Sequence, residues 1–169
     1  MSPGDENFAR KRLKDDFSKI LTNPPVGVSG SPRDDDLMTW DCVVCGLPGS
    51  SVEFGIFELT LNFPASYPFH PPTVKFSTEM FHPNISGDGT LILTRWSPAQ
   101  GVMEILTHIQ SLLSQPLLSS TVNMEAAQLY EENRREYIWT GEEEEWGEDG
   151  DWEENKDEEG ENEEDEKNE

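Results

Sequence analysis

The chain has 169 residues and a formal net charge of −23 at neutral pH, which suits one domain with an appendage better than two domains. No run of about 18 apolar residues occurs, so we expect no membrane span. The first residues of the chain contain no apolar stretch, so we expect no secretory signal. Two cysteines favour a reducing compartment, so we expect a protein of the nucleus, the cytoplasm or both.

The negative charge is concentrated at the end of the chain. Residues 141–169 hold 18 acidic and two basic residues, a net charge of −16, whereas residues 1–140 hold 17 acidic and ten basic residues, or −7. Close-spaced like charges with few apolar residues disfavour a packed core. We therefore predict a folded domain over residues 1–140 and a disordered acidic tail over residues 141–169.

The first predicted helix covers residues 8–21. Four apolar residues recur there at helical spacing and would form one buried stripe: Leu13, Phe17, Ile20 and Leu21. The first half of this helix is basic, with Arg10, Lys11, Arg12 and Lys14. Residues 23–25 (NPP) end the helix, because proline disfavours helical geometry in the residue before it.

Four strands are predicted next, over residues 26–31, 37–45, 56–63 and 73–76. The clearest is 56–63, where alternate residues are apolar: Phe57, Leu59, Leu61 and Phe63. Residues 46–51 (GLPGSS) have the composition of a hairpin turn. Short links between successive strands favour an antiparallel meander of four strands.

Two helices complete the predicted fold. Residues 101–113 carry apolar residues on one face, and Pro116 ends this central helix. A third helix begins at about Asn123, a favoured N-cap residue, and fades near residue 140. The fold class is therefore α+β, with an N-terminal helix, a four-stranded antiparallel meander and then helices.

Three short motifs follow one another in the middle of the chain: residues 67–72 (YPFHPP), 82–84 (HPN) and 96–99 (WSPA). In this order and spacing they resemble the ubiquitin-conjugating enzymes, and the likeness covers Phe8 to about Tyr137. The segments ARKRL, PPVGVSGSP, MFHPN, ILTHIQSLL and EAAQLYEENRREY, with the acidic tail, are most similar to the branch that modifies histones and serves post-replication DNA repair. The resemblance also implies that the last family helix is truncated, because glutamates begin soon after Tyr137.

The resemblance implies thioester exchange, in which a cysteine accepts the carboxyl group of ubiquitin and passes it to a lysine. It assigns Asn84 to stabilising the oxyanion and places the cysteine eight residues later, where Ile92 stands. Six residues separate Gly89 from Trp96 here, where that branch has ten. Either Ile92 replaced the cysteine, or a deletion removed it. Isoleucine forms no thioester, so we predict that the standard reaction does not occur.

Other residues offer poor substitutes for the missing nucleophile. Cys42 and Cys45 lie three positions apart on a predicted strand, hence on opposite faces, and are best interpreted as small apolar residues. No zinc-like spacing joins them to a histidine, so neither a metal nor a cofactor is expected. Thr90 or Thr94 could hold an oxyester, but no base is evident nearby. Asn84 and His82 have a second interpretation as purely structural turn residues.

The resemblance implies three binding surfaces. A RING-type ligase would contact Phe69, Pro98 and Ala99, although a lone exposed aromatic residue at a turn also explains Phe69. The activating enzyme would face the basic residues of the first helix, which solvation alone explains equally well: Arg10, Lys11, Arg12 and Lys14. A second ubiquitin would dock on the outer face of the sheet at Ser29.

We therefore expect a ubiquitin-conjugation-pathway protein that lacks the active-site cysteine and binds a ligase, another conjugating enzyme or ubiquitin. One alternative is an active conjugating enzyme that transfers ubiquitin to lysines of histones or repair proteins. Further alternatives are an acidic histone-binding protein that acts through its tail, and a decayed copy without function. Direct contact with nucleic acid is not expected, because the acidic tail would repel phosphates.

Overall fold

The computed structural model describes residues 3–132, and residues 1–2 and 133–169 lie outside the described part. The elements, in chain order, are α1 (Pro3–Thr22), β1 (Val28–Arg33), β2 (Asp36–Cys45), β3 (Ile56–Asn62), β4 (Thr73–Phe76), β5 (Thr90–Leu91), α2 (Val102–Ser114), the short 3₁₀ helix η1 (Leu118–Ser120) and α3 (Met124–Glu132). The predicted α+β class, with a helix, an antiparallel sheet and then helices, is confirmed.

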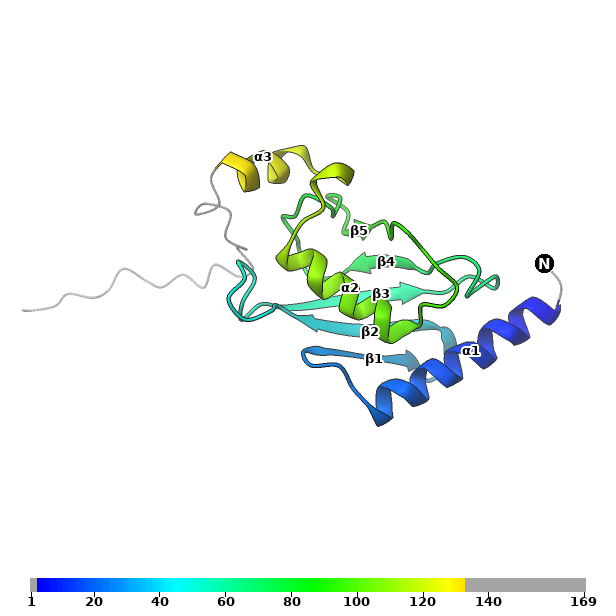
Figure 1. Ribbon diagram of the computed structural model, residues 1–169. Helices are drawn as coiled ribbons and strands as arrows, with labels where there is room; N and C mark the ends of the chain where they lie inside the picture. The colour runs from blue at the N-terminus through cyan, green and yellow to red at the C-terminus, as the bar shows by residue number, and fades with distance from the viewer. Residues whose placement is uncertain (1–2, 133–169) are drawn as a thin grey trace, which may run out of the picture.

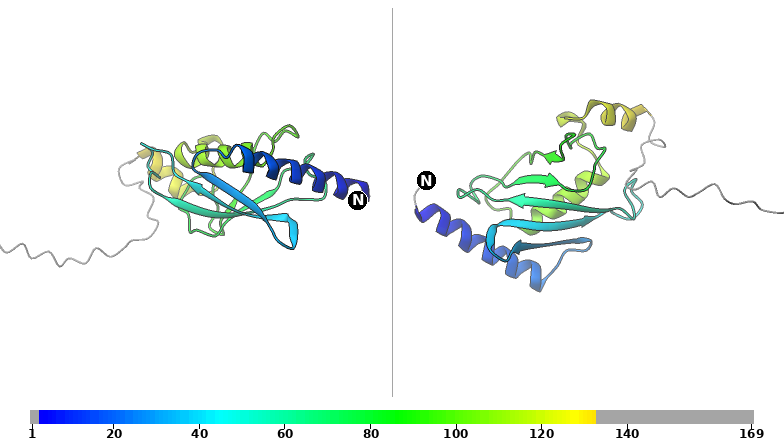
Figure 2. Two further views of the ribbon diagram at one scale, coloured as in Figure 1. Left: turned by 90° about the horizontal axis from the view of Figure 1, so that it is seen from below. Right: turned by 180° about the vertical axis from the view of Figure 1, so that it is seen from behind.

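The sheet has its strands in sequence order, β1-β2-β3-β4-β5, and every neighbouring pair is antiparallel. Both α1 and α2 contact β1 and β2, and the two helices also contact each other. Seen nearly edge-on, the two helices lie on the same side of the sheet (Figure 2, left). The core therefore fills the layer between one sheet face and these two helices.

Alternation along the strands decides which side chains enter this core. The helix-facing residues of β2 and β3 are buried, among them Trp40, Phe57 and Leu61, while Asp41 and Glu58 on the other face are exposed. From α2, the apolar stripe supplies Ile105, Leu106, Ile109 and Leu113, all at most 2 % exposed. Hydrophobic burial of these two matched faces holds α2 against the sheet. Figure 1 shows α2 lying across the strands.

The sequence prediction of four strands was incomplete, because the sheet has a fifth strand, β5. Two residues are too few for an alternating pattern to show in a sequence. Helix α1 also begins five residues before its predicted start. A proline in the first turn lacks only an amide that would have no helical partner, and Asp5 and Glu6 favour the positive end of the helix dipole.

The predicted N-cap of the third helix is confirmed, because Asn123 Oδ1 accepts a hydrogen bond from the Ala126 amide at 3.1 Å. Within the described part, α3 ends at Glu132. The predicted continuation toward residue 140, the truncated last helix and the acidic tail all lie outside the described residues. Among residues 3–132, no helix is both long and apolar enough to cross a membrane.

Candidate functional site

His82 is a buried structural residue at the start of the HPN turn. Its ring is 1 % exposed, with Nε2 2.9 Å from the Leu112 carbonyl oxygen in α2. The Asn84 amide donates to His82 Nδ1 at 3.0 Å, so Nδ1 accepts and Nε2 carries the proton. Burial lowers the pKa of His82 to about 4, against a hydrogen bond to the Leu112 carbonyl that raises it. The neutral ring joins the turn to α2.

The side-chain amide of Asn84 is fully occupied by the segment that follows α2. Its Nδ2 donates to the carbonyl oxygens of Leu117 at 2.7 Å and Ser120 at 3.0 Å, and its Oδ1 accepts from the Leu117 amide at 2.8 Å. The residue is only 7 % exposed. Both amide protons are thus used within the protein, which is the arrangement expected for an architectural residue rather than for one that stabilises an oxyanion.

Ile92 lies close to the HPN turn along the backbone pairing. An isolated antiparallel bridge pairs Leu91, the residue before Ile92, with Ile85, the residue after Asn84. The Ile92 side chain is 69 % exposed, whereas Leu91 is buried. The position predicted from the family spacing is therefore beside the HPN turn and open to solvent, but its side chain is a hydrocarbon that can neither attack a carbonyl nor hold an acyl group.

The link from β5 to Trp96 is short and sharply bent. Only four residues, 92–95, connect them, and Arg95 has a φ of 57°, in the left-handed region that non-glycine residues rarely adopt. Trp96 nevertheless packs on the core, and its Nε1 donates to the Pro68 carbonyl oxygen at 2.8 Å. The Trp96 hydrogen bond therefore holds the WSPA segment against the YPFHPP turn.

Both thiols of the chain lie on β2, away from the HPN turn. Cys42 faces the core at 3 % exposure, and burial raises the pKa of its thiol to about 12. Cys45, three residues on, is half-buried on the outer face. Three strand spacings of about 4.8 Å separate β2 from β5, so both thiols lie at least about 14 Å from β5 and from Ile92, which follows it. Neither can serve as a nucleophile there.

An exposed aromatic pair joins α1 to the YPFHPP turn. The ring of Phe69 is stacked on the ring of Phe8, with centroids 5.9 Å apart and planes inclined by 14°. Phe8 is 51 % and Phe69 63 % exposed, so the pair presents a flat apolar surface. Sequence reasoning missed Phe8 as a site residue. The sequence feature that could have identified Phe8 is an aromatic residue on the predicted helix that lies outside the apolar stripe.

Arg12 holds the WSPA loop. Its guanidinium donates to the carbonyl oxygens of Pro98 at 3.0 Å, Ala99 at 3.4 Å and Gln100 at 3.2 Å. On its other side it bonds the buried Asp16 carboxylate at 3.4 Å, which also accepts from the Tyr67 hydroxyl at 2.7 Å. These bonds direct the donors of Arg12 toward its own protein, and the expectation that Arg12 faces an activating enzyme stays a prediction.

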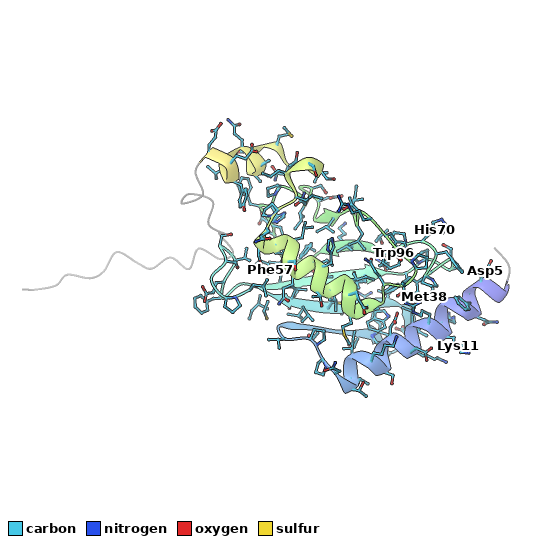
Figure 3. All side chains as sticks on the ribbon, in the orientation of Figure 1. Asp5, Lys11, Met38, Phe57, His70 and Trp96 are labelled. Carbon is cyan, nitrogen blue, oxygen red and sulfur yellow. The ribbon has the colours of Figure 1, made fainter. Side chains whose placement is uncertain are left out.

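The other predicted binding residues lie on the surface. Arg10 forms a salt bridge with Glu6 at 3.0 Å, and Lys11 and Lys14 are exposed along α1. In Figure 3, Lys11 lies on the same helix as Asp5, and Trp96 and His70 lie toward the N-terminal end of that helix. Ser29 is exposed on β1 and pairs with Val43. Its neighbour Gly30 faces α2, so Ser29 faces the outer side of the sheet.

The structure therefore brings together all three predicted ligase-contacting residues, Phe69, Pro98 and Ala99, through the hydrogen bonds of Trp96 and Arg12. Ser29 lies apart, on β1. Across residues 3–132, no group of three or more histidine, cysteine or acidic side chains is placed to hold a metal ion.

Comparison with known proteins shows which family the chain is similar to. Residues 12–144 match the family model described as ubiquitin-conjugating enzyme. The chain is 50 % identical over 133 residues to "Ubiquitin-conjugating enzyme E2 1" of Caenorhabditis elegans, covering 76 % of this chain and 69 % of that protein. It is also 50 % identical over 134 residues to proteins named "Ubiquitin-conjugating enzyme E2 2" from Aspergillus fumigatus and Emericella nidulans, covering 77 % of this chain and 89 % of each.

Proposed function

Since this chain belongs to the ubiquitin-conjugating enzyme family, we propose that it acts in the ubiquitin-conjugation pathway by binding, without carrying ubiquitin on a thioester. One observation carries the proposal: Ile92 follows the Leu91–Ile85 bridge beside the HPN turn, while both thiols lie on β2. The full use of the Asn84 amide by Leu117 and Ser120 supports it further, because a residue freed from catalysis can keep an architectural role.

The partner that the surface favours is a RING-type ligase. The stacked rings of Phe8 and Phe69 offer an exposed apolar anchor, and aromatic anchors commonly dominate the energy of an interface. Beside them, Arg12 fixes Pro98 and Ala99 before any partner arrives. A surface ordered in advance loses less conformational freedom on binding, which favours affinity. Ubiquitin or another conjugating enzyme would be held at other faces, with Ser29 as the proposed contact for ubiquitin.

The proposal is tested by offering full-length protein to activating enzyme, ATP and ubiquitin, and separating the products with and without reductant. We expect no adduct that reductant removes. The double variant Cys42→Ser/Cys45→Ser is the matched control and should give the same result. An adduct that is lost both with reductant and in that variant contradicts the proposal. Binding to a panel of RING domains then tests the partner, with Phe69→Ala as the variant that should lose affinity.

An active conjugating enzyme is the second candidate, and the comparisons favour it over the non-catalytic function, because the similar proteins are named as conjugating enzymes. In this chain the reaction would need a hydroxyl acceptor. Thr94 is exposed and Thr90 half-buried on either side of the Ile92 position. A ubiquitin adduct that resists reductant but is cleaved by hydroxide, and that disappears in Thr90→Ala or Thr94→Ala, would support this candidate.

A third candidate follows from charge. The net charge of −16 over residues 141–169 would attract basic proteins, including histones, and fits the proposed likeness to the histone-modifying and repair branch and a nuclear location. Histone pull-down with the full chain, and with a variant ending at residue 140, tests this candidate. It requires binding that is lost when the tail is removed, while the ligase-binding proposal requires ligase affinity that survives the same truncation.

A further inference from the structure

Three apolar side chains project into solvent at one end of the sheet. Val26 is 93 %, Phe54 92 % and Ile56 62 % exposed, and we call them the end patch. They lie on neighbouring segments, because Ile56 pairs with Cys45 in the sheet and the Cys45 amide donates to the Gly27 carbonyl oxygen at 2.7 Å. A single exposed apolar residue is ordinary, but three on connected segments indicate a surface that something covers.

The backbone at Phe54 strengthens this inference. Its φ is 68°, in the left-handed region where a bulky side chain is rare and costs conformational energy. Backbone hydrogen bonds hold the loop that carries Phe54. The Gly46 amide donates to the Gly55 carbonyl oxygen at 3.0 Å, and the Glu53 amide donates to the Ser50 carbonyl oxygen at 3.1 Å. Among residues 3–132 almost nothing covers the ring. Folding of this part alone therefore does not explain a phenylalanine at this position.

We propose that the segment of this chain over residues 134–139 (RREYIW) docks on the end patch. The segment follows directly on the described part, which ends at Glu132, and the seven residues to residue 139 can extend about 23 Å. The last residues of α3 and the loop between β2 and β3 lie at the same end of the molecule in the views of Figures 1 and 2. The segment supplies three consecutive apolar side chains, at residues 137–139.

Charge complementarity supports the same occupant. Two arginines, Arg134 and Arg135, precede the apolar triplet. Two carboxylates border the end patch: Glu53 lies next to Phe54, and Glu58 is exposed on the same face of β3 as Ile56. Opposite charges beside an apolar contact fix the register of a docked segment.

A second exposed apolar group fits the segment less well. It comprises Leu117, Leu118, Val122 and Met124. This group lies where α3 begins, whereas the chain leaves α3 at its other end. Residues 117–124 also contain no charged side chain that could pair with the arginines. The end patch is therefore the better site.

Docking would reach a face with a proposed role. Ile56 and Ser29 lie on the same outer face of the sheet, as the register of β1, β2 and β3 requires. The docked segment would border that face and limit access to it by a ubiquitin molecule. The limited access of ubiquitin rests on the proposed function. The docking of the segment does not depend on that function.

The half-buried Cys45 thiol reports on the docking, because its cross-strand neighbour Ile56 belongs to the end patch. Full-length protein is alkylated with iodoacetamide, and mass spectrometry gives the labelling rate of each cysteine. In Ile138→Ser/Trp139→Ser, Cys45 should react about tenfold faster, which corresponds to a docked state favoured by ~1.4 kcal/mol. The matched control Trp146→Ser/Trp152→Ser should leave the rate unchanged. Cys42 is buried and should stay unreactive in every folded variant.

Phe54→Gly provides the reciprocal test, because glycine relieves the positive φ and should not harm folding. It should raise the Cys45 rate by the same factor, and combining it with Ile138→Ser/Trp139→Ser should add nothing further. A Cys45 rate within twofold of the parent in the segment variant overturns the proposal. So do independent, multiplying effects of the two changes, or a parent rate that falls with protein concentration, which would indicate a second copy on the patch.

Discussion

Replacing Arg12 by alanine should destabilise the domain and disorder the WSPA loop. The substitution removes hydrogen bonds to three carbonyl oxygens and the 3.4 Å contact with Asp16. Asp16 is 2 % exposed, and its remaining hydrogen bond within residues 3–132 comes from Tyr67. Losing one partner of a fully buried ion pair costs about 3–5 kcal/mol. The Arg12 side chain is 23 % exposed and its bond to Asp16 is long, so we expect about 2 kcal/mol.

Thermal unfolding measures this loss directly. For a domain of this size, 2 kcal/mol lowers Tm by roughly 8 °C. Arg12→Lys should fall between the parent and Arg12→Ala, because an ammonium group cannot address three carbonyls as the guanidinium fork does. Lys11→Ala, an exposed position on the same helix, is the control and should change stability by less than about 0.5 kcal/mol. An Arg12→Ala protein that melts within about 1 °C of the parent would show that the Arg12 hydrogen bonds do not stabilise the domain.

Three further outcomes are expected. Asn84→Ala should lower the free energy of unfolding by about 2 kcal/mol in denaturant titrations, since it removes three hydrogen bonds to the segment after α2. An unchanged free energy of unfolding would contradict the architectural role of Asn84. The folded pKa of His82 is about 4, below its unfolded value near 6.5, so its contribution to stability is complete above pH 6.5 and lost as pH falls toward 4. Unfolding at pH 7 and pH 5 should differ by about 2 kcal/mol more in the parent than in His82→Gln. Phe69→Ala should weaken binding to a cognate RING domain at least tenfold, by isothermal calorimetry, at unchanged Tm, and an equal affinity would count against the aromatic anchor.

Periodicity made most of the fold predictable. The stripe of α2 and the alternation of β3 are long enough to indicate one structure each, and β4 was predicted at its observed bounds, Thr73–Phe76. β5 could not be predicted, because its two residues are held by pairing with β4 and by the bridge between Ile85 and Leu91. The turn over residues 46–51 was placed correctly but is part of a longer link, which runs to Gly55.

The candidate site was predictable as a list of residues but not as a geometry. Motif order located Asn84, Ile92 and Phe69, because each lies inside a short distinctive string. The contacts that give these residues their roles join distant parts of the chain. Phe8 meets Phe69, and Arg12 turns toward carbonyls 86 to 88 residues away, instead of facing solvent with its basic neighbours. Helical periodicity cannot distinguish a solvated arginine from one that binds a loop.

The most direct test of the central claim is the intact mass of the full chain after incubation with activating enzyme, ATP and ubiquitin under non-reducing conditions. The location of both thiols on β2, with Ile92 beside the HPN turn, predicts that the mass stays that of the unmodified chain. A species heavier by one ubiquitin less one water, removed by reductant and missing from Cys42→Ser/Cys45→Ser, would contradict that account.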